Sequence, residues 1–105
     1  MAKVIVSPAA RKDLLSIRAY IRDELSNPQA ARHVIGALRE AVEKLALFPR
    51  RGRPLDAMIS AHTDYRYMPC GDYCIFYLED DENVVVVRIL HQRQDCMRAL
   101  FIERS

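Results

Sequence analysis

The sequence contains little glycine, little cysteine and no tryptophan: its 105 residues include three glycines and three cysteines. The glycines, Gly36, Gly52 and Gly71, are too few for a Rossmann fingerprint and do not form a Walker loop, which excludes these nucleotide-binding motifs. Three cysteines are an odd number, so we expect free thiols in place of a disulfide framework.

Long apolar runs are absent as well. The longest purely aliphatic stretch is Val84 to Val87, far short of the roughly 18–20 residues that a membrane span needs. The N-terminus has neither a long apolar segment nor a small-residue cleavage site, so we expect no signal peptide. The sequence therefore predicts a cytoplasmic chain that does not enter a membrane.

Neither sign of charge is in large excess. Sixteen basic and 14 acidic residues give a net charge of +2, which is too little to indicate nucleic-acid binding by bulk charge. Half of the residues are hydrophobic and 29% are charged, as in an ordinary folded domain, so we expect one domain over residues 1–105. The histidines and cysteines have no metal-ligand spacing, and we expect neither a metal nor a cofactor.

Two segments that open with proline predict a helix hairpin. A short β-branched segment, Lys3 to Val6, predicts a strand, and Ser7-Pro8 then supplies a helix N-cap and a proline at the first helical position. The first helix is expected from about Pro8 to Leu25. Asn27-Pro28 repeats the start signal, and Phe48-Pro49 ends the second helix, so the short gap between the helices requires an antiparallel hairpin. The apolar stripes of the two helices are Ala10, Leu14, Ile17, Ile21 and Leu25, and Ala31, Ile35, Leu38, Val42 and Leu45.

The second half of the chain changes to the alternating pattern of strands. Asp64 to Cys70, Tyr73 to Glu79 and Val84 to His91 are predicted as three strands. Gly71-Asp72 joins the first two as a two-residue hairpin loop, with glycine at the first position of a type II′ turn. The expected fold class is α+β: an N-terminal strand, an antiparallel helix hairpin and a three-stranded antiparallel meander, with the helices on one face of the sheet.

The two-residue turn fixes the register of the first two strands, and directly opposed residues share a face of the sheet. It pairs Cys70 with Tyr73 and, further along, Arg66 with Tyr77. An even-length acidic loop places Arg88 on this same face, while an odd length would flip the last strand. We take the even length, because it separates the arginines from the more continuous apolar face.

These assignments predict one covered face and one open face. The covered face, under the helices, is expected to carry Phe76, Leu78, Val85, Val87 and Ile89. The open face would carry two arginines and two tyrosines, Arg66, Arg88, Tyr73 and Tyr77. Arginine beside tyrosine suits phosphate contact with stacking, or capture of an acidic peptide. Arg88 interrupts an apolar strand, so it needs a paired partner or a wet surface, and we expect a binding role over a structural ion pair.

The densest positive cluster lies in the loop after the second helix and consists of Arg50, Arg51 and Arg53. It is either a solvated loop or a contact for phosphate or for an acidic partner. His91 ends the last strand, where a histidine is usually structural. It becomes a candidate general acid or base only if a substrate phosphate reaches it. A short helix over Cys96 to Phe101 is expected in the tail.

Several short motifs follow one another along the chain: Ser7-Pro8-Ala9-Ala10, Asp13-Leu14, Tyr20-Ile21, Leu47-Phe48-Pro49, Gly52-Arg53-Pro54-Leu55, Tyr65-Arg66, Gly71-Asp72-Tyr73, Ile75-Phe76-Tyr77 and the run from Val87 to Asp95. With the order of the elements, this set resembles the RelE/ParE superfamily of toxins from bacterial type II toxin–antitoxin systems. The resemblance covers nearly the whole chain. The ending with His91, Arg93 and Asp95 resembles the ParE branch.

The resemblance implies a function. ParE-like toxins bind DNA gyrase, block its strand passage and arrest growth, and a cognate ParD-like antitoxin holds them inactive. The antitoxin is expected to dock on the helix hairpin and the open sheet surface, and to supply most contacts with operator DNA. On the hairpin the candidate antitoxin contacts are Leu14, Ile21, Ile35 and Leu38. Further candidates for target or antitoxin contact are Arg50, Arg51, Arg53, Arg66, Tyr73, Tyr77, Arg88 and Arg93.

The alternative is a ribosome-dependent messenger RNA endonuclease of the RelE branch. Arg66 and Arg88 resemble phosphate-binding arginines of that branch, and His91 lies near its terminal histidine or tyrosine. The reaction also needs a base for the ribose 2′-hydroxyl, and the arginines that replace lysines in the basic loop do not lose their protons at a useful pH. We therefore favour the gyrase inhibitor, which is not an enzyme. A toxin relic that binds an antitoxin but has no target would be expected to lack these arginines.

Overall fold

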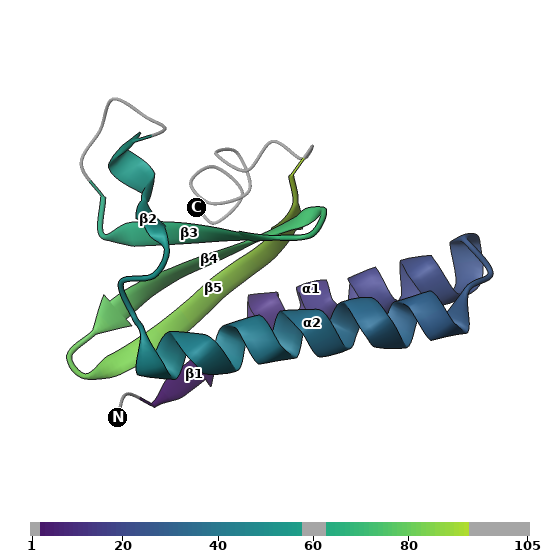
Figure 1. The fold of residues 1–105 in the computed structure, drawn as a ribbon, viewed down its shortest axis with the longest axis horizontal. Helices are drawn as coiled ribbons and strands as arrows, with labels where there is room; N and C mark the ends of the chain where they lie inside the picture. Colours follow the sequence, from purple (N-terminus) through teal and green to yellow (C-terminus); the bar gives the residue numbers. More distant parts are fainter. Residues whose placement is uncertain (1–2, 58–62, 93–105) are drawn as a thin grey trace.

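Two antiparallel helices lie across one face of a twisted five-stranded sheet in the computed structural model, which describes residues 3–57 and 63–92 (Figure 1). The strand order is β1-β5-β4-β3-β2, with β1 parallel to β5 and all other neighbours antiparallel. In chain order the elements are β1 (Val4–Val6), α1 (Pro8–Ala19), η1 (Tyr20–Glu24), α2 (Pro28–Leu47), β2 (Arg53–Pro54), η2 (Leu55–Ala57), β3 (Tyr65–Cys70), β4 (Tyr73–Asp80) and β5 (Asn83–His91).

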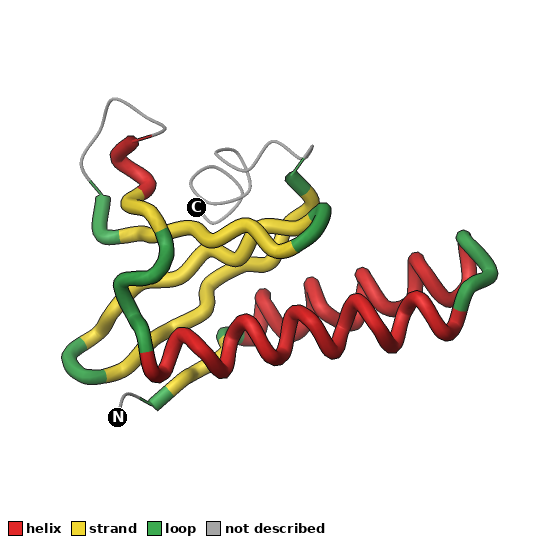
Figure 2. The backbone as a smooth tube through the Cα atoms, in the orientation of Figure 1, coloured by secondary structure: helices red, strands yellow, loops and turns green. Residues whose placement is uncertain are grey.

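Both helices begin as predicted. The side chains of Ser7 and Asn27 each accept a hydrogen bond at 3.0 Å from the backbone N–H three residues later. The first helix, predicted from about Pro8 to Leu25, is α1 followed by the π-helical turn η1, and α2 ends at Leu47 as the following proline requires. Figure 2 shows the hairpin projecting past the sheet.

Within the described residues, no helix has both the length and the apolar character that crossing a membrane requires.

The three predicted strands form in the predicted order. β3 and β4 pair in the predicted register, from Cys70 opposite Tyr73 to Arg66 opposite Tyr77. Gly71 has a φ of +60°, as the first position of a type II′ turn requires. The region after α2 contains the two-residue strand β2 at the outer edge of β3 and the short 3-10 turn η2.

The predicted position of Arg88 is wrong, because β5 contains a bulge. Leu78 and Tyr77 pair with β5 as predicted, but Val87 is then an extra residue before the next pair. Arg88 therefore lies opposite Phe76 and does not share a face with Arg66. A bulge of one residue moves every later side chain of the strand to the other face.

The prediction of which face the helices cover is also wrong. The sheet residues under the helices are Met68, Ile75, Tyr77, Val84, Val86 and Ile89. Phe76, predicted to lie beneath the helices, instead packs with Leu55, Cys74 and Leu90 in a smaller cluster. Both faces of this sheet are apolar, so the alternation of side chains does not tell which face the helices cover.

An ion pair joins α1 to β5. Arg88 donates two hydrogen bonds to the carboxylate of Asp13, at 2.8 and 2.9 Å, and the same carboxylate accepts the backbone N–H of Ile89 at 2.9 Å. The Arg88 and Asp13 side chains are only 19% and 13% exposed. Arg88 interrupts an apolar strand because the largely buried carboxylate of Asp13 binds it in a bidentate manner and compensates its charge. Arg88 therefore forms a structural ion pair and does not have the free binding role that was predicted.

Removing either partner of this pair should lower the free energy of unfolding by about 3 kcal/mol, because the other charge stays buried without compensation. We expect Asp13→Ala and Arg88→Ala to show this loss in urea denaturation, and the double variant to lose clearly less than the sum of the two. Glu24→Ala, at an exposed helix end, is the control. Strictly additive losses, or single losses below about 0.5 kcal/mol, would contradict the assignment.

Candidate functional site

The loop that follows α2 is held by a tyrosine from the core. We call residues 49–53 the arginine loop. The Tyr77 side chain is 0% exposed, and its hydroxyl donates to the backbone carbonyl of Pro49 at 2.8 Å while accepting the backbone N–H of Gly52 at 2.8 Å. One hydroxyl group therefore satisfies backbone groups at both ends of the loop and fixes their separation.

Gly52 has no space for a side chain. A Cβ atom there would lie 2.5 Å from the Tyr77 hydroxyl oxygen and 2.8 Å from the Tyr67 carbonyl oxygen. Contacts this short require the loop or the strand to move. The position therefore requires glycine because of close approach to β3 and β4.

Arg66 also holds the loop. Its Nη1 donates to the Gly52 carbonyl at 2.8 Å, and the side chain is half-buried. Burial raises the pKa of the Tyr77 phenol, against the opposing effects of the Gly52 hydrogen bond and the Arg66 charge. Tyr77 is therefore a neutral hydrogen-bond donor at physiological pH. Neither residue lies on an open sheet face as predicted, because the helices cover this face and the loop closes its end.

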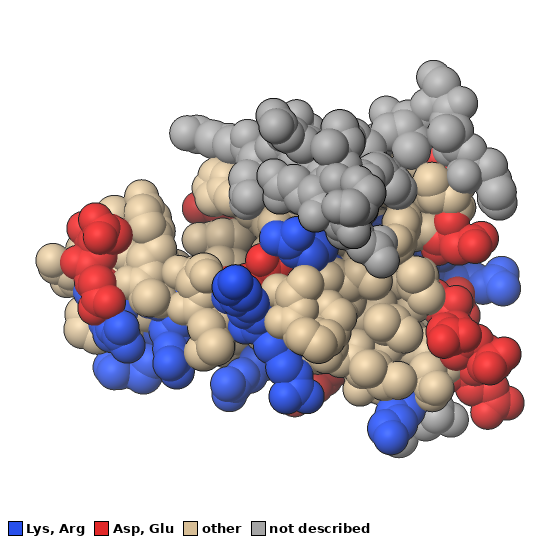
Figure 3. Space-filling model, turned by 180° about the vertical axis from the view of Figure 1, so that it is seen from behind, with Lys and Arg blue, Asp and Glu red and all other residues tan. Residues whose placement is uncertain are grey.

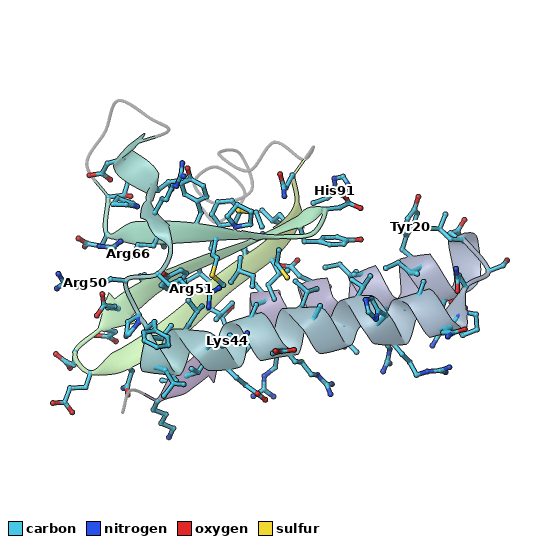
Figure 4. The ribbon with its side chains drawn as sticks, in the orientation of Figure 1. Tyr20, Lys44, Arg50, Arg51, Arg66 and His91 are labelled. Carbon is cyan, nitrogen blue, oxygen red and sulfur yellow. The ribbon has the colours of Figure 1, made fainter. Side chains whose placement is uncertain are left out.

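The other arginines of the loop point to solvent. Arg50, Arg51 and Arg53 are all exposed, and Arg50 Nε lies 3.8 Å from Glu79 Oε1. Within residues 3–57 and 63–92, no acidic side chain lies within ion-pair distance of Arg51 or Arg53. Figure 4 shows Arg50, Arg51 and Arg66 together at the end of the molecule where α2 meets the sheet.

A hollow of about 640 Å³ lies beside this loop. We call it the loop hollow, and its lining residues are Phe48, Pro49, Arg50, Arg51 and Glu79. Phe48 is 60% exposed and the preceding Leu47 is 59% exposed. Neither residue was among the candidates predicted from the sequence. The sequence does contain a signal for them: both residues are large and apolar, yet they lie off the apolar stripe of α2 and so are expected to be exposed.

His91 and Tyr73 lie at the other end of the sheet. Their rings meet edge-to-face, with centroids 5.4 Å apart. Burial, followed by the charges of Asp72 and Tyr20, raises the pKa of Tyr73. With Asp13, Ser16, Ile17, Tyr20, Ile89 and Leu90, the two rings line a hollow of about 340 Å³.

The three residues proposed for nuclease chemistry do not converge. Arg66 pairs with Tyr77 and His91 pairs with Tyr73, which are four residues apart along β4 and hence roughly 13 Å apart. Figure 4 shows Arg66 and His91 at opposite ends of the sheet. Arg88 is engaged by Asp13 of α1. A single phosphate does not reach all three groups in this arrangement.

The apolar candidates on the helix hairpin belong mainly to the core. Ile21, Ile35 and Leu38 are buried members of the main core cluster, and Leu14 is half-buried and packs against it. The hairpin still offers an apolar groove of about 440 Å³ between α1, α2 and β1. Its lining residues are Val6, Arg11, Leu14, Leu15, Leu38, Arg39, Val42 and Glu43, and we call it the hairpin groove. Figure 3 shows Lys and Arg side chains gathered along the hairpin.

The remaining residues singled out in the sequence are Arg93 and the cysteines, and some of them lie outside the described residues. Arg93, Cys96 and the predicted tail helix lie outside the described residues. Cys70 and Cys74 form no disulfide, and burial raises the pKa of the Cys70 thiol. In the described part of the chain, no cluster of three or more histidine, cysteine or carboxylate side chains could hold a metal ion.

Comparison with known families gives one match over most of the chain. The family model for the ParE toxin of the type II toxin–antitoxin system, parDE, matches residues 4–96. Comparison with curated proteins gave no match.

Solved structures of toxin–antitoxin systems share the fold. The chain is similar to a chain in the structure of the chromosomal ParDE system of P. aeruginosa, with 19% sequence identity and a TM-score of 0.72. The match covers 87% of this chain and 96% of the P. aeruginosa chain. This chain is also similar to one in the toxin–antitoxin complex RelBE2 of Mycobacterium tuberculosis, with 23% identity, a TM-score of 0.64, and coverage of 87% and 98%. At these identities the likeness shows the fold alone.

Replacing Tyr77 with phenylalanine should lower the free energy of unfolding by about 1–3 kcal/mol, because it leaves a buried N–H and a carbonyl of the arginine loop without partners. Urea denaturation followed by circular dichroism measures the loss. Tyr20→Phe, which removes an exposed hydroxyl, is the matched control and should change stability little. Equal stability of Tyr77→Phe and the wild type would show that the two hydrogen bonds of the Tyr77 hydroxyl contribute nothing to the free energy of unfolding.

Proposed function

The chain belongs to the ParE toxin family of type II toxin–antitoxin systems, and from this premise we propose that it arrests growth by inhibiting DNA gyrase. The observation that carries the proposal is the family match over residues 4–96, because gyrase inhibition is the activity expected of the ParE branch. The likeness to the P. aeruginosa ParDE structure is consistent with it.

The positions of the arginines support a protein inhibitor over a ribonuclease. Cleavage of RNA through the ribose 2′-hydroxyl needs a base, an acid and cationic groups around one phosphate. Arg66 is instead bonded to Gly52, roughly 13 Å from His91 along the sheet, and the guanidinium of Arg88 is engaged by the carboxylate of Asp13. The arginines left exposed, in the arginine loop, do not act as general bases.

A cognate ParD-like antitoxin is the proposed second partner. The similar structures from P. aeruginosa and M. tuberculosis are described as a ParDE system and a toxin–antitoxin complex. The hairpin groove suits an amphipathic segment of such a partner, because Leu14 and Leu15 supply apolar contact and Arg11 and Arg39 can meet carboxylates. With a net charge of only +2, the toxin is expected to meet operator DNA through the antitoxin.

Induction of this chain alone in bacteria tests the function. We expect DNA synthesis to stop within minutes, before protein synthesis, with gyrase-linked DNA breaks. The purified chain should inhibit supercoiling of relaxed plasmid by gyrase, and the cognate antitoxin should prevent this. Early collapse of protein synthesis with messages cut on ribosomes, and unimpaired supercoiling, would contradict the proposal.

A further inference from the structure

The end of α2 exposes two large apolar side chains that the fold does not use. Leu47 and Phe48 are 59% and 60% exposed, and neither belongs to a core cluster. The backbone N–H of Phe48 caps the helix by donating to the Lys44 carbonyl at 3.0 Å, a bond that any residue other than proline could make. Single exposed apolar residues are common, but two neighbours beside a hollow form a patch that favours contact with a partner.

This patch is held rigidly. The Arg51 backbone N–H donates to the Phe48 carbonyl at 3.0 Å. The Tyr77 hydroxyl bonds to the backbone of Pro49 and Gly52, on either side of Arg50 and Arg51. A partner that binds here does not have to order a flexible loop. Lower entropy loss on binding raises affinity for the same contact area.

In the described lining of the loop hollow, the charged residues are two arginines and one glutamate. Arg50 and Arg51 line the loop hollow, and Arg53 follows them in the arginine loop. Among the described residues, Glu79 is the one acidic residue of the lining, and its Oε1 lies 3.8 Å from Arg50 Nε. Arg51 also lines a second hollow, of about 320 Å³, between α2 and β3. The surface therefore continues from Phe48 past Arg51 toward the edge of the sheet.

We propose that Leu47, Phe48, Arg50 and Arg51 form the surface by which the toxin binds its protein target, and that the target presents an apolar side chain next to acidic ones. Aromatic side chains and arginine are the residues that most often dominate binding energy at protein interfaces. Arg51, which has no acidic partner within the described residues, is complementary to a carboxylate, which a guanidinium binds in a bidentate manner. The inference rests on the proposed function in taking this target to be DNA gyrase.

A protein segment fits this surface better than nucleic acid does. An aliphatic side chain such as Leu47 offers no stacking face to a base, whereas it packs well on apolar protein side chains. The surface is also separate from the hairpin groove, since no described residue lines both the groove and the loop hollow. Antitoxin and target can therefore be tested independently.

Two variants with matched controls test the proposal. Phe48→Ala and Arg51→Glu should lower the affinity for purified gyrase at least tenfold and abolish growth arrest. Leu25→Ala, at a side chain 56% exposed, and Arg18→Glu, on the exposed side of α1, should leave both unchanged. All four changes are at exposed positions, and thermal unfolding checks that each variant remains folded. Each variant should still co-purify with the cognate antitoxin.

The outcomes separate this inference from the proposed function. Growth arrest and gyrase affinity that survive in Phe48→Ala and Arg51→Glu would overturn the inference, as would loss of antitoxin binding alone. Loss of affinity for duplex DNA or RNA, with gyrase affinity kept, would assign the surface to nucleic acid and overturn it as well. A further outcome is that the wild type does not bind gyrase while both variants still abolish growth arrest. In that case the surface is needed for binding another protein target, and the proposed function, gyrase inhibition, is wrong.

Discussion

The buried hydroxyl of Tyr77 determines where the arginine loop lies. It comes from β4, in the middle of the sheet, and bonds to backbone groups at Pro49 and Gly52. The bond to Gly52 is buried and the bond to Pro49 is partly buried, so displacing the loop would leave polar groups unpaired, at a cost of about 1–3 kcal/mol for a buried group. The close approach needed for these bonds explains why residue 52 is glycine. The backbone of the loop is thus bonded to a core side chain, although the arginine side chains of the loop face solvent.

The arginines of this chain divide by what compensates their charge. Arg66 and Arg88 bond within the chain, to the Gly52 carbonyl and the Asp13 carboxylate, and they stabilise the positions of the arginine loop and α1. Arg51 and Arg53 have no such acidic partner within residues 3–57 and 63–92. An arginine that is already bonded contributes little to a partner, whereas an exposed one beside apolar side chains can contribute much. This division favours the loop over the open sheet face as the target surface.

Local signals in the sequence predict most of the fold. Ser7-Pro8 and Asn27-Pro28 place the helix starts, and Gly71-Asp72 sets the register of β3 and β4. The covered face of the sheet is not predictable in this way, because both faces are apolar. The Arg88 partner is equally hidden, since Asp13 lies 75 residues away in the sequence. Long-range contacts of this kind depend on how the elements pack, and a bulge of one residue in β5 changes them.

Hydrogen exchange of the Gly52 amide in the free toxin, measured by NMR, tests most directly whether the arginine loop is fixed before any partner binds. We expect this N–H to exchange as slowly as the backbone amides of β4, because its acceptor is the buried Tyr77 hydroxyl. The amide of exposed Arg50 in the same loop is the internal comparison. If the Gly52 amide exchanges as fast as that of Arg50, the loop opens freely, and a rigid surface at the end of α2 is contradicted.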